Sequence, residues 1–276
     1  MFIHNIDPVL FRLGTLEIRY YGLFYVAGFV IAYFLINYLA KQRHLNLTSD
    51  DVAEFLIYLI VGTVLGARVV YVAVYNPLYY LGNPLEILAL WHGGLSFHGG
   101  FLGASIASLL FIKKQKHKGI TFYKMADVTM FPLALGLMIG RIGNFMNGEL
   151  YGRVTSLPWA VKFKDASGYR HPSQLYESAK NLFIFAVLWW LKDRKIRVGK
   201  KGDKNASVQY KKLPDGFLFY SFIILYAILR FLIEFVREPD SQLGFFFGWL
   251  TMGQILNILM LLVGSVMMWR LLKHDR

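Results

Sequence analysis

The sequence of 276 residues contains no cysteine, and only 17% of its residues are charged. Without cysteine the chain has no disulfide, no thiolate metal ligand and no cysteine nucleophile of its own. A soluble domain carries charge on about a quarter of its residues, whereas 56% of this chain is hydrophobic. The composition therefore indicates a polytopic membrane protein.

A helix needs about 20 mostly apolar residues to cross a bilayer, and the chain has several such segments. The sequence predicts seven spans, at residues 22–40, 52–75, 95–112, 126–141, 177–191, 216–236 and 251–271. Residues 1–20 are charged and lack the order of a cleaved signal peptide, so we expect an external N-terminal arm. The expected fold is an all-α polytopic membrane protein, with residues 1–276 forming one integral membrane domain.

The connection between the second and third spans contains no lysine or arginine. Basic residues are abundant after the first, third and fifth spans and in the C-terminal tail. These basic residues are Lys41, Arg43, Lys113, Lys114, Lys116, Lys118, Lys124, Lys192, Arg194, Lys195, Arg197, Lys200, Lys201, Lys204, Lys211, Lys212, Arg270, Lys273 and Arg276. The positive-inside rule then places the N-terminus outside and the C-terminus in the cytoplasm. The net charge of +13 is explained by this topology and by lipid headgroups, and we expect no nucleic-acid binding.

With this orientation, the longest external connection is residues 142–176, which we expect to form a small external subdomain. The sequence shows no internal repeat, and seven is an odd number of spans. Both observations argue against a transporter built from inverted repeats.

Polar residues inside apolar segments give the strongest functional signal. Tyr226, Arg230 and Glu234 are spaced four apart, which places them on one face of a helix. A charge inside a membrane costs roughly 2.5–3.5 kcal/mol even on the lenient insertion scale, so such residues are expected to be functional.

Other polar residues are expected to meet these three at the outer membrane surface: Tyr21, His98, Arg141, Asn144, Glu149, His171 and Arg237. Only Arg68 and Asp127 depart from this group, which favours a one-sided pocket over a route across the membrane. Arginines near an outer headgroup region suit a phosphate ligand, because guanidinium offers planar, bidentate donors.

Glycines occur in two GxxxG pairs, Gly62–Gly66 and Gly136–Gly140, whose usual role is helix packing. Gly99 and Gly100 follow His98 in SFHGGFLG and would let a backbone or a ligand approach closely.

Six stretches resemble the bacterial prolipoprotein diacylglyceryl transferase family: RYYGLFYVAG (19–28), WHGGLSFHGG (91–100), GRIGNFMNGELYGR (140–153), RHPSQLYE (170–177), YAILRFLIEFVREPD (226–240) and TMGQILNILM (251–260). The resemblance implies that phosphatidylglycerol donates its diacylglyceryl group to the lipobox cysteine thiol of a prolipoprotein. A thioether forms and glycerol-1-phosphate leaves. It also implies a bacterial cytoplasmic (inner) membrane protein with its active site toward the outer leaflet, without cofactor or metal.

The chemistry of the implied reaction and the positions of the candidate residues suggest their roles. Arg141 and Arg230 would hold and stabilise the phosphate, with Glu234 as a salt partner of Arg230. His98 is the first candidate for the base that activates the thiol, since histidine titrates near neutral pH.

The other candidates are expected to bind or position the substrates. Asn144 and Glu149 would order the loop around the headgroup. Tyr21 and Tyr226 would donate hydrogen bonds to the phosphate or position His98, and Tyr21 belongs with His98, Arg141 and Arg230 to the predicted catalytic set. His171 is a second base candidate, or a residue that fixes the loop to the fifth span. Gly99 and Gly100 complete the predicted substrate-binding set.

Two other functions are open to the same residues. A headgroup transporter or flippase would need a polar route to the cytoplasm and repeat symmetry, and the sequence shows neither. A non-catalytic lipid-binding scaffold would form no product. A hydrolase lacks support, because no HExxH zinc motif and no GxSxG elbow is present.

Overall fold

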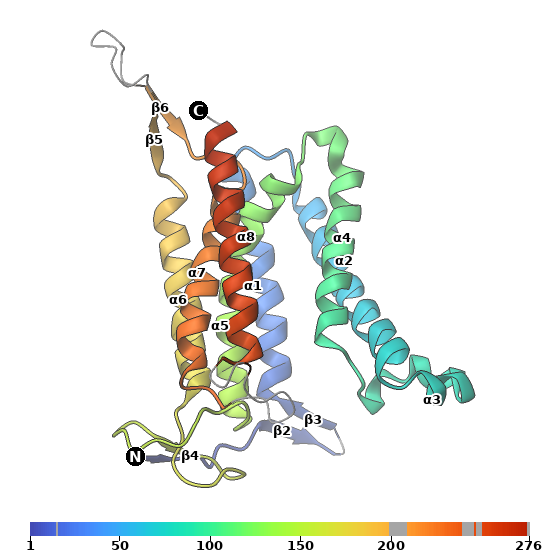
Figure 1. Ribbon diagram of the computed structural model, residues 1–276. Helices are drawn as coiled ribbons and strands as arrows, with labels where there is room; N and C mark the ends of the chain where they lie inside the picture. Colours follow the sequence, from blue (N-terminus) through green and yellow to red (C-terminus); the bar gives the residue numbers. More distant parts are fainter. Residues whose placement is uncertain (15, 199–208, 239–245, 247–249, 275–276) are drawn as a thin grey trace. The chain divides into compact units, whose positions relative to one another are not determined.

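The computed structural model describes residues 1–14, 16–198, 209–238, 246 and 250–274 (Figure 1). Lys200, Lys201, Lys204, Pro239, Asp240 and Arg276, which were used above, lie outside the described residues. The chain forms two compact units. One comprises residues 1–32 and 126–276, and the other comprises residues 33–125.

Eight α-helices occur among the described residues, and short 3₁₀ and π turns connect some of them. The α-helices are α1 (Tyr20–Gln42), α2 (Ser49–Val70), α3 (Pro77–Gly82), α4 (Phe97–Lys114), α5 (Phe122–Met146), α6 (Ser173–Leu191), α7 (Phe217–Glu234) and α8 (Met252–His274). The predicted helical, polytopic architecture is confirmed.

Five helices are long and apolar enough to cross a membrane: α1, α2 extended to Tyr75, α5, α7 and α8. The two other expected spans, 95–112 and 177–191, are helices α4 and α6, with 18 and 19 residues. Helix α4 begins with glycines and ends with lysines, and α6 buries a polar face, which lowers the hydropathy of both. The count of seven spans therefore stays a prediction.

Three pairs of short strands lie outside the helices, which the sequence did not predict. β1 (Phe2–Ile3) pairs in parallel with β4 (Val161–Lys162), β2 (Val9–Leu13) pairs antiparallel with β3 (Leu16–Arg19), and β5 (Lys195–Val198) pairs antiparallel with β6 (Gln209–Lys212). The pairing of β1 with β4 joins the N-terminal arm to the loop after α5.

His4 strengthens this junction between the arm and the loop. Its Nε2 atom lies 2.7 Å from the carbonyl oxygen of Phe145, and its ring packs against the rings of Phe145 and Phe163. The arm and residues 142–176 therefore share one set of contacts.

Asp127, one of the two polar residues set apart in the sequence, fixes the start of α7. Its carboxylate accepts hydrogen bonds from the backbone N–H groups of Gly216, at 3.0 Å, and Phe219, at 2.9 Å. The first N–H groups of a helix have no partner within the helix, so a buried carboxylate here satisfies two of them. Asp127 is thus accounted for by the fold.

Arg68, the other such residue, organises the segment that precedes α4. Its buried guanidinium donates to the carbonyl oxygens of Ile87 at 2.8 Å and Gly93 at 2.6 Å, and also to those of Glu86, Gly94 and Ala89. The N–H groups of this guanidinium are therefore hydrogen-bonded to backbone carbonyl oxygens, which gives Arg68 a structural role.

The first GxxxG pair packs α2 against α4, as predicted. A Cβ atom on Gly62 would lie 2.5 Å from the Cβ of Ala107, and one on Gly66 would lie 2.7 Å from the Cα of Gly103. The same prediction for Gly136 and Gly140 stays a prediction, because a Cβ on either would meet no atom of another described element within 4 Å.

Candidate functional site

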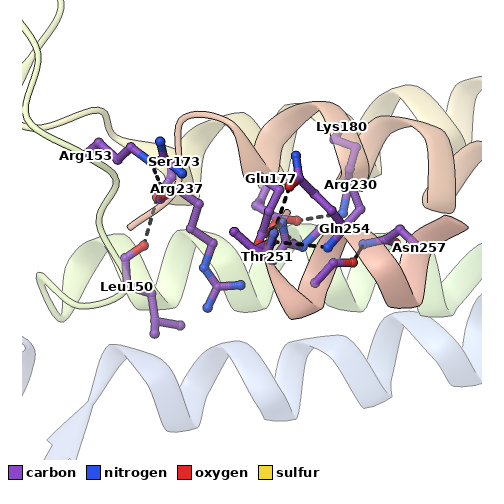
Figure 2. A network of polar contacts seen from close by, with 12 residues as sticks. Leu150, Arg153, Ser173, Glu177, Lys180, Arg230, Arg237, Thr251, Gln254 and Asn257 are labelled. Carbon is purple, nitrogen blue, oxygen red and sulfur yellow. Dashed lines mark hydrogen bonds and ion pairs between the residues drawn. The ribbon is translucent and has the colours of Figure 1, made fainter. Parts of the chain in front are cut away.

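Helices α6, α7 and α8 of the first unit bury a cluster of charged side chains, with α7 in contact with the other two (Figures 1 and 2). The centre of the cluster is Arg230 on α7. Its Nε forms an ion pair with Glu177 Oε1 on α6 at 3.0 Å, and its Nη1 donates a hydrogen bond to Glu234 Oε2 one turn further along α7. All three side chains are less than 10% exposed. The predicted Arg230–Glu234 pair is present.

Helix α6 adds a second cation, Lys180. Its Nζ donates to Glu177 Oε2 at 2.6 Å and lies 3.8 Å from the centre of the Tyr226 ring. The sequence analysis missed both Glu177 and Lys180 as site residues. Their signal was a charged pair three residues apart in a predicted span, the same kind of signal that identified Arg230 and Glu234.

Helix α8 completes the surroundings of Glu234. The Thr251 hydroxyl donates to Glu234 Oε1 at 2.9 Å, and the Thr251 backbone N–H donates to Gln254 Oε1 at 3.0 Å. Gly253 lies so close that a Cβ atom there would be 2.6 Å from Glu234 Oε1. Both oxygens of Glu234 therefore have partners, and only glycine fits beside them.

Arg141, near the end of α5, lies beside the residues that shape the following loop. Its Nη1 is 3.5 Å from Asn144 Oδ1, and Asn144 Nδ2 donates to Glu149 Oε1 at 2.8 Å. The loop is tied to the start of α6, where Gln174 Nε2 donates to the carbonyl oxygen of Glu149 and the Ser173 hydroxyl donates to that of Leu150. The structure thus brings Arg141, Asn144 and Glu149 together.

Arg237, just beyond α7, is a further arginine of this region. The pKa of its guanidinium is lowered, first by burial, next by the positive charge of Arg230, and also by that of Arg141. Among the described residues nothing accepts a hydrogen bond from this guanidinium, and Figure 2 shows it turned away from the ion pairs of Arg230. Its backbone is held instead, because Arg153 Nε donates to the Arg237 carbonyl oxygen at 2.9 Å.

The charges of this region leave a positive excess. Glu177 and Glu234 balance Lys180 and Arg230, while Arg141 and Arg237 add two further positive charges. The exposed Glu149 carboxylate, hydrogen-bonded to Asn144, offsets only one of them. An arrangement with several partly buried guanidinium groups and a net positive charge suits an anion.

Tyr21 and His171 lie at the edge of the same unit. The Tyr21 ring packs on Gly143, where a Cβ atom would be 2.9 Å from Cδ2 of the ring, and its hydroxyl lies 3.1 Å from that of Tyr25. His171 Nδ1 lies 3.2 Å from the Tyr176 hydroxyl. Burial lowers the pKa of the His171 imidazole, which favours its neutral form.

The backbone of His171 joins the loop after α5 to the segment before α6. Its N–H donates to the carbonyl oxygen of Arg153 at 3.0 Å, and its carbonyl oxygen accepts from Gly152 N at 2.9 Å. This geometry matches the predicted role of His171 in fixing the loop.

His98, Gly99 and Gly100 belong to the other unit, at the start of α4. The His98 side chain is exposed and contacts the edge of the Phe97 ring. Gly99 and Gly100 pack on α2, where Cβ atoms would lie 2.6 Å from Val70 Cβ and 3.3 Å from Thr63 Cγ2. These contacts explain both glycines by helix packing, and the binding and catalytic roles of the three residues stay predictions.

A family model described as "Prolipoprotein diacylglyceryl transferase" matches residues 8–270 of the chain. The chain belongs to this family. The resemblance seen in the sequence motifs is thereby confirmed.

Curated relatives agree over nearly the full length of the chain. A phosphatidylglycerol–prolipoprotein diacylglyceryl transferase of Geobacter sulfurreducens is 45% identical over 265 residues, which cover 95% of this chain and 94% of the relative. The protein of the same name from Bordetella avium is 43% identical over 95% of this chain and 93% of its own. That of Nitratidesulfovibrio vulgaris is 42% identical over 94% of this chain and 92% of its own.

Four of the six motifs that carried the resemblance to the prolipoprotein diacylglyceryl transferase family supply residues of the charge cluster or, in the case of Arg141, a positive charge beside it. GRIGNFMNGELYGR supplies Arg141, RHPSQLYE supplies Glu177, YAILRFLIEFVREPD supplies Arg230 and TMGQILNILM supplies Thr251. Lys180 lies in none of these stretches. The described residues also contain no group of three histidine, aspartate or glutamate side chains that fits a metal ion.

Proposed function

We propose that this chain transfers the diacylglyceryl group of phosphatidylglycerol to the lipobox cysteine of a prolipoprotein, the first step of bacterial lipoprotein maturation. Family membership and the printed names of its relatives support this activity. The observation that carries the proposal is the excess of positive charge at the partly buried Arg141 and Arg237 beside the buried, paired Arg230, built from motifs typical of the family.

The reaction is a displacement at a carbon of glycerol. The cysteine sulfur of the prolipoprotein forms a C–S bond to the glyceryl carbon, and the bond from that carbon to the phosphate oxygen breaks. The electron pair stays on the oxygen, so glycerol-1-phosphate leaves. The nucleophile is a thiol of the substrate, which is compatible with a chain that contains no cysteine.

The arginines would stabilise the negative charge that grows on the leaving phosphate. Arg230 is fixed by two carboxylates through Nε and Nη1, and its Nη2 makes no hydrogen bond to a described residue. Arg141 and Arg237 carry the positive charge that no carboxylate in the cluster balances. Arg230 would therefore present a fixed donor, and the other two would supply most of the attraction for the anion.

Substrate contacts near the arginines would come from residues already held in place. Asn144 and Glu149 would face the glycerol hydroxyls of the headgroup, and Tyr21 and Tyr226 would donate hydrogen bonds to the phosphate. His98 remains our candidate for the base that takes the thiol proton, and Gly99 and Gly100 pack on α2 beside it. The role of His171 is to fix the external loop.

The proposed setting is a bacterial cytoplasmic membrane crossed seven times, with the N-terminus outside and the C-terminus inside. In the first unit, the charge cluster lies where α6 and α8 begin and α7 ends. Basic residues gather where α6 and α8 end: Lys192, Arg194, Arg270 and Lys273. The positive-inside rule assigns that second end to the cytoplasm, which would put the site at the outer leaflet. The arm and residues 142–176 would then form one external subdomain.

A reconstituted assay tests the proposal. Purified protein is mixed with phosphatidylglycerol and a lipobox peptide, and the products are analysed by mass spectrometry for diacylglyceryl peptide and glycerol phosphate. We expect both products from wild-type protein, none from a peptide with cysteine changed to serine, and almost none from Arg141→Ala. Folded wild-type protein that binds lipid but forms no product would overturn the transferase in favour of a transporter or a scaffold.

A further inference from the structure

Lys180 is the most deeply buried cation of the charge cluster. Its side chain is only 1% exposed, it sits in the second turn of α6, and its Nζ has Glu177 at 2.6 Å. Burying an ammonium group is costly unless it is paired, and an apolar residue would fill this position without that cost. The presence of lysine here calls for a role that an apolar side chain cannot perform.

The two oxygens of Glu177 are shared between two cations. Oε2 accepts from Lys180, and Oε1 lies 3.0 Å from Arg230 Nε. Arg230 in turn is paired with Glu234. Without Lys180, Arg230 alone would face two carboxylates, and the four-residue cluster would carry a net negative charge next to the proposed phosphate site.

Lys180 also contacts a second predicted substrate residue. Its Nζ lies 3.8 Å from the centre of the Tyr226 ring, within the range of a cation–π interaction. Tyr226 is one turn before Arg230 on α7, and the Lys180 ammonium thus touches one predicted phosphate ligand and, through Glu177, orients another.

We propose that Lys180 is a positioning residue for the anionic headgroup of the donor lipid, supplying the charge that balances Glu177 and so leaving the charge of Arg230 available to phosphate. This inference rests on the proposed function and names a determinant of donor affinity within it. The physical effect is electrostatic. One uncompensated negative charge about 10 Å from a phosphate, at an effective dielectric constant of about 20, weakens binding by about tenfold or somewhat more.

Kinetics of Lys180→Met test this role, because methionine keeps much of the side-chain volume and removes the charge. We expect the KM for phosphatidylglycerol to rise about tenfold, which corresponds to about 1.4 kcal/mol, with a smaller change in kcat. Lys192→Met, at the other end of α6 from the cluster, is the matched control and should keep the wild-type KM.

The double variant Lys180→Met with Glu177→Gln separates charge from packing. It removes one positive and one negative charge, so the cluster is neutral again, and we expect a KM well below that of Lys180→Met alone. A purely structural lysine would give no such recovery, because glutamine does not refill the contacts of the lost ammonium. Lys180→Gln, which keeps a hydrogen-bond donor but no charge, replaces Lys180→Met if the latter does not accumulate as folded protein.

Retention of fluorescent phosphatidylglycerol by the detergent-solubilised protein gives a readout without turnover. Weaker retention by Lys180→Met and recovery in the double variant support the inference. An active Lys180→Met enzyme with wild-type KM and retention overturns it, as does a loss that the double variant does not reverse. Absence of product from wild-type protein speaks against the transferase itself, while retention still decides the role of Lys180.

Discussion

Two groups of helices in this protein are joined by opposite kinds of residue. Helices α2 and α4 meet at glycines, with Gly62 and Gly66 of one against Gly103 of the other. Helices α6 and α7 meet at charges, with Arg230 against Glu177. Between lipid-embedded helices there is little hydrophobic driving force, so both close backbone packing and polar contacts are effective. The glycine junction brings backbone atoms together, whereas the charged junction contains groups that could bind an anion.

The energetic costs of the two junctions differ. Glycine packing buries no charge, whereas each charged side chain in a span costs roughly 2.5–3.5 kcal/mol on the insertion scale. Replacing a buried ion pair with well-packed apolar residues is often neutral or stabilising. Stability alone would therefore favour the glycine type of junction everywhere. The charges between α6, α7 and α8 are better explained by the anion that they are proposed to attract.

The largest expected effect comes from removing arginines of the charged region. Arg141→Ala should lower turnover about 100- to 1,000-fold, the loss typical of one missing donor to a developing oxyanion. Its unfolding midpoint should stay near that of the wild type, because Arg141 is not paired with a buried carboxylate among the described residues. Product analysis and thermal unfolding in detergent measure the two quantities.

Two further variants sharpen this prediction. Arg141→Lys should restore little activity if guanidinium binds phosphate through two parallel hydrogen bonds. Arg230→Ala should lower the unfolding midpoint as well as turnover, because it leaves Glu177 and Glu234 with one fewer cation. Normal turnover of Arg141→Lys would contradict bidentate binding of phosphate. Normal turnover of Arg141→Ala would show that Arg141 is not part of the site.

The glycine junction is tested by adding volume. Gly66→Leu should destabilise the protein by about 1–3 kcal/mol or more, because its Cβ would lie 2.7 Å from Gly103 Cα and neither backbone can easily move. Gly136→Leu is the matched control, since its Cβ would meet no described atom within 4 Å. Tryptophan fluorescence during thermal unfolding reports the difference. Equal midpoints for the two variants would contradict the packing role of Gly66.

Helix positions were largely predictable from hydropathy. The expected spans 52–75 and 216–236 match α2 with its extension, Ser49–Tyr75, and α7, Phe217–Glu234. The strands of the arm and loop were not predicted, because β1 and β4 have two residues each and pair across about 160 positions of sequence. Periodicity within a window cannot detect such a pairing.

The site was predictable where charge interrupts an apolar run and not where the fold decides which charges meet. Spacing alone predicted the pair of Arg230 and Glu234, since residues four apart share a helix face. The contact of Arg230 with Glu177 joins two helices and depends on their register, which the sequence does not reveal. For the same reason the GxxxG pattern does not reveal which helix a glycine pair contacts: the packing is confirmed at Gly62, while no contact is seen at Gly136 among the described residues.

A smaller effect is expected from Arg237→Ala. Arg237 contributes positive charge without a hydrogen-bonded partner among the described residues, so its loss should weaken attraction for the anionic lipid while the ion pairs of Arg230 remain. We expect the KM for phosphatidylglycerol to rise about tenfold, as for one lost charge at moderate distance, and kcat to change less. An unchanged KM would show that the positive charge of Arg237 does not contribute to binding of the lipid.

The smallest effect concerns the pH dependence of stability at His171, in the connection between α5 and α6. Burial lowers the pKa of His171 below the value of about 6.5 expected for the unfolded chain, so between the two values the unfolded state binds more protons. The contribution of neutral His171 to stability is therefore complete above pH 6.5 or so and is lost as the pH falls through the folded-state pKa. His171→Gln should lose this part of the acid sensitivity, by about 2 °C in unfolding midpoint between pH 7.5 and 5, because partial solvent exposure screens the effect. An acid-induced drop in midpoint as large in His171→Gln as in wild type would assign the sensitivity to other groups and leave His171 with its backbone contacts alone.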